Sequence, residues 1–298
     1  MIKMQLSIII ITYNRADQVR EAIVSCLNCN LPSSTEFIVI DNASEDNTTQ
    51  VIEDLKKNIL FDIHYHKMID NLGVGPARNY AFNIASGEYI YNLDDDAVID
   101  PADKNFFINA IEIFEKYPLI ATLTTQIYDL AWTANRVTST DIKIYSDIFK
   151  CFTPCGGSHF LRRKYFDSPV YFPNKYGYEE IATALQAHSK GYYNVFCPSL
   201  LIIHKPRVNK WSKDNNPMLY INDFSSQFAI KSILYPKIIT PLLWIIYNLR
   251  YLKHLRNKKL RKVGRHNINI LKKMSVDFKP INIGQFISLF KDFGISIL

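Results

Sequence analysis

Acidic residues are missing from one long stretch of this sequence, which runs from Phe224 to Val276. The same stretch holds twelve lysines and arginines, so it accounts for the whole excess of positive charge in a chain of formal charge +7. The rest of the chain is mildly acidic. The basic stretch therefore needs its own explanation, and the isoelectric point says little about the front of the protein.

A second Cys-x-x-Cys pair and an export signal are also missing. Cys26 and Cys29 have the spacing of metal ligands, but no matching histidine or second pair accompanies them, so we expect buried thiols rather than structural zinc. The five cysteines are an odd number, and the opening apolar run lacks a small-residue cleavage site. Reduced thiols and a cytoplasmic location are expected.

Short apolar runs alternate with amphipathic segments over the first part of the chain. Continuous β-branched runs are typical of strands buried on both faces, and the predicted strands are 6–12, 36–41, 62–66 and 88–93. Helical periodicity fills the intervals, and Pro76 and Gly87 are expected in the first turn and just past the end of the third helix. This order predicts a parallel α/β sheet, in which ligands bind beyond the carboxyl ends of the strands.

Three consecutive carboxylates, Asp94, Asp95 and Asp96, follow the last of these strands. Acids often mark a strand-to-loop boundary, which explains one aspartate but not three in a row. A divalent cation neutralises clustered carboxylates and bridges them to a diphosphate. In an extended segment Asp94 and Asp96 point the same way and Asp95 the other way, so the first and third are expected to face the ligand together.

Six motifs share an order that is informative beyond the aspartates. They are SIIIITYNR, VIDNASEDNT, NLGVGPARNYAFNIASGEYIYNLDDD, CGGSHFLRRKYF, YGYEEIATALQAHSKGY and PSLLIIH. Together they resemble family 2 glycosyltransferases, over roughly residues 5 to 205. The resemblance implies an α/β fold of the GT-A type, a Rossmann-like, mixed and mainly parallel sheet flanked by helices, here with a helical basic C-terminal tail.

The same resemblance implies a division of the chain. Residues 1–100 would form the nucleotide-sugar-binding half of the GT-A domain, and residues 101–215 its acceptor-binding and catalytic-base half. Residues 216–298 would form a helical, basic C-terminal region.

The resemblance also implies roles for single residues. Those expected to bind the nucleotide sugar are Thr12, Tyr13, Asn14, Asp41, Arg78, Asp94, Asp95 and Gly157. Asp41 would accept a hydrogen bond from the imide N–H of a uracil or thymine base, and Arg78 would reach the nucleotide. Asp96 and His204 are the expected ligands of Mn²⁺ or Mg²⁺, although a histidine that ends an apolar strand can also be a core residue.

An acidic pair, Glu179-Glu180, opens a predicted helix that Gly191 ends. The resemblance makes Glu180 the base that deprotonates the acceptor hydroxyl, and a first-turn position would favour its ionised form through the helix dipole. The alternative is that both acids only stabilise the helix start. The family pattern places an aspartate and a basic residue where this chain has Ala182 and Gln186, which puts acceptor recognition in doubt.

The implied function is metal-dependent, inverting transfer of a sugar from a nucleotide-diphosphate sugar, with UDP- or dTDP-sugars favoured. The acceptor would be a hydroxyl of a glycan or lipid-linked glycan in surface polysaccharide synthesis. A catalytically impaired nucleotide-sugar or glycan-binding relative is the alternative that Ala182 and Gln186 support. A nucleotidyltransferase is disfavoured because TYNRADQ after the first strand lacks a glycine-rich phosphate loop.

The basic stretch begins a predicted helix at Thr240-Pro241, with Thr240 as its cap. Its apolar stripe is Leu242, Ile245, Ile246, Leu249, Leu252 and Leu255. The stripe is too short to span a bilayer, but residues 240–273 suit the surface of an anionic membrane, which would place the protein peripherally at the inner face of the cell membrane. A helical cap on the catalytic domain is an equal alternative, and no nucleic acid partner is expected.

Overall fold

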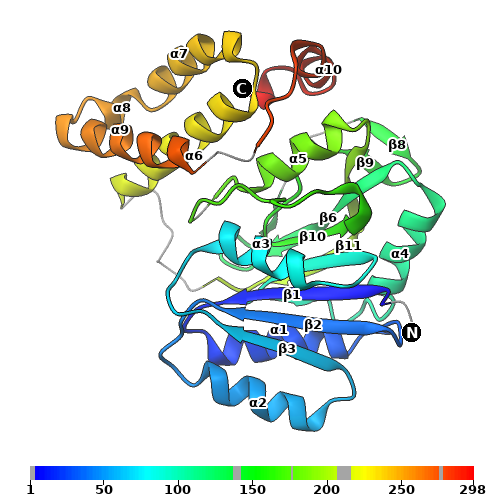
Figure 1. Ribbon diagram of the computed structural model, residues 1–298. Coiled ribbons are helices and arrows are strands. Elements are labelled where there is room, and N and C mark those ends of the chain that lie inside the picture. The colour runs from blue at the N-terminus through cyan, green and yellow to red at the C-terminus, as the bar shows by residue number, and fades with distance from the viewer. Residues whose placement is uncertain (1–3, 137–141, 176, 207–215, 275–277) are drawn as a thin grey trace.

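The protein, seen in a computed structural model that describes residues 4–136, 142–175, 177–206, 216–274 and 278–298, is built around one mixed sheet (Figure 1). The order of its hydrogen-bonded strands is β3-β2-β1-β4-β10-β6-β11-β9-β8, with β5 paired to β11 and β7 paired to β6. The expected mixed, mainly parallel sheet flanked by helices is confirmed.

Four parallel strands form the N-terminal half of the sheet. They are β1 (Leu6–Thr12), β2 (Thr35–Asp41), β3 (Asp62–Lys67) and β4 (Tyr89–Asp94). Each lies within one or two residues of its predicted bounds. In the register Thr12 lies opposite Asp41, and Ile11 lies opposite Asp94, so the polar strand ends meet at one edge.

The other half of the sheet adds an antiparallel strand to this parallel set. β10 (Ser158–Arg162) lies antiparallel between β4 and β6 (Ile120–Asp129), and β6 runs parallel to β11 (Tyr193–His204). The shorter strands are β5 (Ala97–Ile99), β7 (Ala134–Asn135), β8 (Lys143–Tyr145) and β9 (Ile148–Lys150). Because β5 pairs antiparallel with β11, the chain that leaves β4 is carried to the end of β11.

Helices cover both faces of the sheet, as the unbroken apolar runs of the strands require. One core lies under α1 (Ala16–Leu27), α2 (Thr48–Asn58) and α4 (Phe106–Lys116) and takes in alternate residues of β1, among them Ile8 and Ile10. The opposite core takes in Ile9 and lies under α3 (Val74–Ile84) and α5 (Glu180–Ser189). A short 3₁₀ turn, η1 (Arg163–Tyr165), follows β10.

Gly87 differs in role from the prediction. The third helix ends at Ile84, and Gly87 lies beyond it against β1, where an added Cβ would be 2.5 Å from the backbone nitrogen of Ser7. Glycine is needed there for close backbone approach rather than for ending a helix.

The C-terminal region is helical, as expected, and lies at the end of the molecule away from β1–β3 (Figure 1). Its elements are α6 (Pro217–Leu234), η3 (Lys237–Ile239), α7 (Thr240–Arg250), α8 (Leu252–Leu255), α9 (Lys258–Lys273), α10 (Ile283–Phe293) and η4 (Gly294–Ile297). Their apolar cluster also includes Phe172, Ile181 and Leu185, so the region packs on α5.

The face that α7 buries differs from the expected stripe. Leu243 and Tyr247 are buried, whereas Leu242, Ile245 and Leu249 are 45%, 57% and 67% exposed. Thr240 is the first residue of the helix rather than its cap, which is Ile239. Within the described ranges, no helix has both the length and the apolar character needed to cross a bilayer.

Candidate active site

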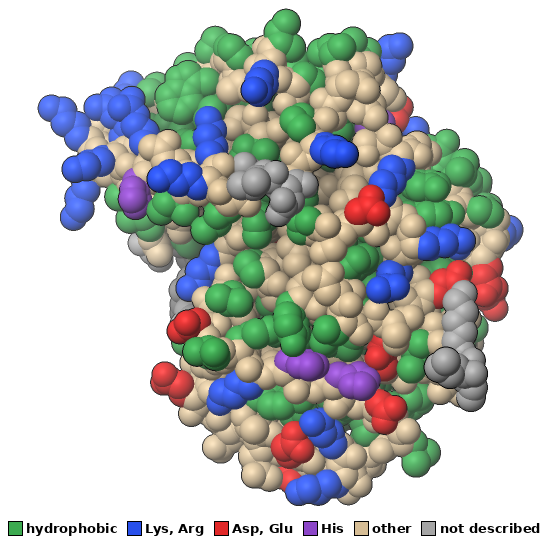
Figure 2. Space-filling view, in the orientation of Figure 1, with side chains coloured by type: hydrophobic (Ala, Val, Ile, Leu, Met, Phe, Trp, Pro, Cys, Tyr) green, Lys and Arg blue, Asp and Glu red, His purple; other side chains and the backbone are tan. Residues whose placement is uncertain are grey.

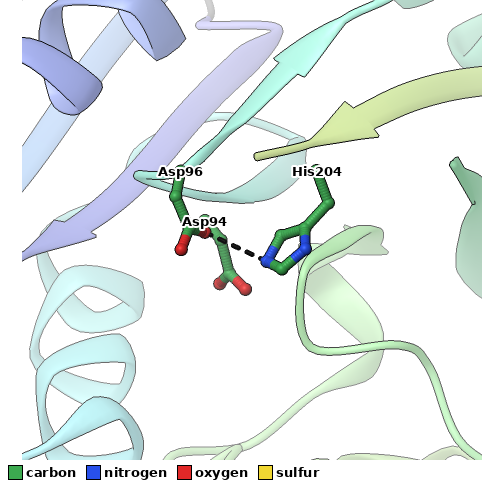
Figure 3. Close-up of side chains that lie close together, drawn as sticks. All are labelled: Asp94, Asp96 and His204. Atoms are coloured by element: carbon green, nitrogen blue, oxygen red, sulfur yellow. Dashed lines mark ion pairs between the residues drawn. The ribbon is translucent and has the colours of Figure 1, made fainter. Parts of the chain in front are cut away.

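Two carboxylates and one imidazole meet beyond the ends of β4 and β11 (Figure 3). Possible ligand atoms of Asp94, Asp96 and His204 all lie within 4.8 Å of one another, and Nε2 of His204 is 3.2 Å from Oδ1 of Asp96. The pairing of β5 with β11 explains this meeting, because it sets Ala97 opposite His204. Asp94 and Asp96 come together as predicted, but through a turn at 95–96 rather than an extended segment.

Asp95 is turned toward a residue that the sequence reading missed. Nη1 of Arg15 lies 2.7 Å from Oδ1 of Asp95 and 2.5 Å from Oδ2 of Asp96. Burial raises the pKa of Asp95 to about 7, in spite of the opposing charge of Arg15. Arg15 directly follows the TYN motif after β1, so its position at a strand end was a usable signal.

His204 is held from behind by a second pair that the sequence reading also missed. Oδ2 of Asp129 lies 3.0 Å from Nδ1 of His204 and 2.8 Å from Nη2 of Arg136. Although burial opposes it, the hydrogen bond with Asp96 raises the pKa of His204. Asp129 ends β6, and the strand-end rule would have found it.

Arg78 lies at the centre of a buried ionic network. Its guanidinium donates to four acceptors, which are Glu179 (3.0 Å), Glu180 (2.8 Å), Asp94 (3.0 Å) and the Gly156 carbonyl (2.5 Å). Only 3% of the residue is exposed. The guanidinium joins Glu180 to Asp94, and the expected reach of Arg78 to the nucleotide stays a prediction.

Glu180 is the first residue of α5, as predicted, but its environment does not favour the ionised form. Burial and the neighbouring charge of Glu179 raise the pKa of Glu180 to about 8, and the opposing charge of Arg78 does not cancel them. Burial thus outweighs the helix dipole on which the prediction relied. Gly156 makes room for the carboxylate, since an added Cβ there would lie 2.4 Å from Oε1 of Glu180.

The remaining residues that are expected to bind the nucleotide sugar surround the same strand ends. Tyr13 is 42% exposed, whereas Asp41 is fully buried and accepts hydrogen bonds from Tyr65 (2.6 Å) and the Ser44 amide (2.7 Å). A base-binding Asp41 would have to open from this packing. Thr12 is buried, and Asn14 adopts a left-handed conformation (φ 53°) with Oδ1 accepting from the Glu45 amide.

Gly157 lies beside the carboxylate of Asp94. Its carbonyl accepts from the Asp94 amide (3.1 Å), and an added Cβ would be 3.3 Å from Oδ2 of Asp94. The two glycines of the CGGSH motif therefore contact different acids, Gly156 beside Glu180 and Gly157 beside Asp94.

The first part of the chain matches a known protein family. Residues 7–168, more than half of the chain, match the family model described as Glycosyl transferase family 2. The chain belongs to this family. The recognition of the family from its motifs is confirmed.

Curated relatives match part of this chain. The poly-β-1,6-N-acetyl-D-glucosamine synthase of Staphylococcus epidermidis is 36% identical over 122 residues, which are 40% of this chain and 27% of the relative. The poly(ribitol-phosphate) β-glucosyltransferase of Bacillus spizizenii is 33% identical over 97 residues, 32% of this chain and 15% of the relative. The chain thus spans about a quarter or less of the length of these relatives.

Solved structures of glycosyltransferases share the fold. The mannosyltransferase PcManGT of Pyrobaculum calidifontis, solved with GDP-Man and Mn²⁺, has a TM-score of 0.60 at 15% identity and covers 96% of this chain and 79% of its own. TarS 1–349 of S. aureus, solved with UDP-GlcNAc, has a TM-score of 0.58 at 16% identity and covers 91% of both chains.

The two departures from the family pattern have structural roles here. Ala182 is buried in the cluster that joins α5 to the C-terminal helices. The side-chain amide of Gln186 accepts from the Asp167 amide (2.6 Å) and donates to the Asp167 carbonyl (3.0 Å). Both positions therefore serve packing of the segments around α5.

Proposed function

We propose that this glycosyltransferase carries out metal-dependent, inverting transfer of a sugar from a nucleotide-diphosphate sugar, with UDP- or dTDP-sugars favoured. The acceptor is a hydroxyl of a glycan or lipid-linked glycan in surface polysaccharide synthesis. The observation that carries the proposal is the single guanidinium of Arg78, which touches both Glu180 and Asp94. It joins the candidate base to one carboxylate of the candidate cation site.

The cation site of the proposal is the cluster of Asp94, Asp96 and His204. Two carboxylates and one imidazole whose ligand atoms lie within 4.8 Å of one another form a donor set that fits Mn²⁺ or Mg²⁺. When bound, such a cation would supply positive charge to the departing diphosphate. Asp129, behind Nδ1, keeps Nε2 of His204 directed at the carboxylates.

Glu180 is the proposed base. Its carboxylate, once deprotonated, accepts the proton of the acceptor hydroxyl as that oxygen forms a bond to the anomeric carbon and the nucleotide diphosphate leaves from the opposite face. Arg78 fixes the carboxylate at 2.8 Å and balances the charge of the acids around it. One base without a second positioned nucleophile supports a single displacement, which inverts the anomeric configuration.

The relatives support the substrate class and the setting. TarS and PcManGT are described with UDP-GlcNAc and GDP-Man, and the curated relatives are named as a poly-β-1,6-N-acetyl-D-glucosamine synthase and a poly(ribitol-phosphate) β-glucosyltransferase. We extend these classes to this chain as part of the proposal. Residues 240–273 would hold it peripherally on an anionic membrane, where lipid-linked acceptors are found.

Donor hydrolysis tests the proposal. The protein is incubated with Mn²⁺ and a panel of UDP-, dTDP- and GDP-sugars, and the released nucleotide diphosphate is measured with and without EDTA. We expect slow, EDTA-sensitive hydrolysis of at least one donor. Donor binding without any release would favour the impaired, sugar-binding relative that Ala182 and Gln186 suggest, and no nucleotide binding at all would overturn the proposal.

A further inference from the structure

A groove of about 830 Å³ lies between α6, α7 and α9, on the C-terminal region and away from the candidate active site. Its apolar lining includes Phe228 of α6, Trp244 of α7 and Ile268 of α9. The rings of Phe228 and Trp244 meet edge to face with centroids 5.1 Å apart. Trp244 is 37% exposed, so part of a large aromatic surface is left open to solvent.

Three cations line the same groove. They are Lys237 before α7 and Arg265 and Lys272 on α9, with Nζ of Lys272 5.6 Å from the centre of the Phe228 ring. The stretch from Phe224 to Val276, which supplies all three, contains no acid. Apolar rings beside clustered cations fit an amphiphile with an anionic head.

The outer surfaces of the two walls differ in character. The outward face of α7 carries the exposed Leu242, Ile245 and Leu249, whereas the outward face of α9 carries Lys258, Lys262 and Lys273. Figure 2 shows lysines and arginines gathered over α8 and α9 and hydrophobic side chains over α7. The groove therefore opens between an apolar ridge and a basic ridge.

We propose that this groove binds the phosphate headgroup of an anionic phospholipid and so docks the protein on a bilayer. The phosphate lies among Lys237, Arg265 and Lys272, and Leu242, Ile245 and Leu249 enter the acyl boundary. A free phosphate ester would use the cations but leave the apolar ridge of α7 in water, which is why the bilayer is the occupant. The inference deepens the proposed membrane association. It rests on the proposed function only for the reason why the protein would be at a membrane, which is to reach lipid-linked acceptors.

Vesicle flotation tests the groove with a matched pair of variants. The substitutions Lys237→Gln, Arg265→Gln and Lys272→Gln remove the three groove cations together. The control substitutions Lys258→Gln, Lys259→Gln and Lys262→Gln remove three exposed charges of α9 that do not line the groove. Both proteins lose the same charge, so a diffuse electrostatic attraction would weaken both to the same extent.

We expect wild type to float with vesicles of phosphatidylcholine and phosphatidylglycerol but not with phosphatidylcholine alone. The groove variant should partition at least about tenfold more weakly than the control variant, since its charges make direct contacts. Glycerol phosphate in excess should not release the wild-type protein. Release by glycerol phosphate, or equal weakening of the two variants, would overturn the headgroup site.

Trp244 offers a readout independent of charge. In a Trp132→Phe, Trp211→Phe background, in which Trp211 lies outside the described residues, brominated phosphatidylglycerol should quench the Trp244 emission. Vesicle binding without quenching would contradict the proposed orientation. Donor hydrolysis is measured in the same preparations. If the wild-type protein hydrolyses a nucleotide sugar but never floats, the groove inference is refuted and the proposed function stands. If it floats but hydrolyses no donor, the groove inference stands and the proposed function is refuted.

Discussion

The guanidinium of Arg78 lies 2.8 Å from the carboxylate of Glu180, and through its other nitrogen it reaches Asp94 at 3.0 Å. The proposed base and the proposed cation site therefore share one buried counter-ion. Any change at Arg78 affects both at once, because no other Lys or Arg in the described part of the chain forms an ion pair with Asp94, Glu179 or Glu180.

Replacement of Arg78 tests the structural side of this network. Arg78→Met leaves three neighbouring carboxylates without their cation, and we expect the free energy of unfolding to fall by about 3–5 kcal/mol. Arg78→Lys keeps a charge but cannot span the carboxylates with a fork, so its loss should be smaller. Urea unfolding at neutral pH measures both. A loss below about 1 kcal/mol in Arg78→Met would show that the network is not the main partner of these acids.

The pH dependence of catalysis tests the environment of Glu180. Burial and Glu179 raise its pKa to about 8, and below that pH the carboxyl keeps its proton and cannot accept another. We therefore expect kcat/KM for donor hydrolysis to rise with pH and to level off above about 8. In Glu179→Gln the like charge is removed, so the rising limb should move to lower pH. A limb that stays in place or moves to higher pH would show that Glu179 does not act on the base.

The carboxylate of Asp129 is predicted to orient His204. Asp129→Asn replaces the carboxylate that lies 3.0 Å from Nδ1 of His204 with a neutral, weaker acceptor. We expect Mn²⁺ affinity to fall by about 10–100-fold while the fold is retained. Titration calorimetry with Mn²⁺ alone measures this without any turnover. Asp147→Asn is the control, because that side chain is 76% exposed and pairs only loosely with Lys143 at 3.8 Å. Equal Mn²⁺ affinities in the two variants would show that Asp129 does not position His204.

The three consecutive aspartates should differ in their effect on the cation. Asp96→Asn removes a member of the cluster with His204 and should abolish measurable Mn²⁺ binding. Asp95→Asn alters a side chain that pairs with Arg15 and should leave Mn²⁺ affinity within about tenfold of wild type. Titration of both variants decides the point. If Asp95→Asn loses as much as Asp96→Asn, the division of roles among the three is wrong.

Strand and helix positions could be predicted where the sequence carries a strong local signal. β1 and β2 are continuous β-branched runs that end in polar residues, and the structure places them at the predicted residues to within one position. The face of α7 that is buried could not be predicted, because apolar residues occupy both sides of that helix. Leu243 and Tyr247 are buried, while the equally apolar Leu242 and Ile245 remain exposed.

The site shows the same limit. Motifs at strand ends point to Asp94, Asp96 and His204, but two partners of Arg78, Glu179 and Glu180, lie 101 and 102 positions away along the chain. Nothing in the sequence indicates that residues this far apart will form ion pairs. Burial of Glu180, which raises its pKa, also depends on packing around α5 that only the folded chain provides.

The assignment of Glu180 as the base on a nucleotide-sugar site is tested most directly by Glu180→Gln. The substitution keeps the size of the side chain and its hydrogen bond from Arg78 but removes the proton acceptor. Donor binding by calorimetry and donor hydrolysis with Mn²⁺ are measured on the same protein. We expect donor affinity within about threefold of wild type and hydrolysis reduced at least about 100-fold. Hydrolysis that survives at the wild-type rate with donor affinity unchanged would contradict the assignment.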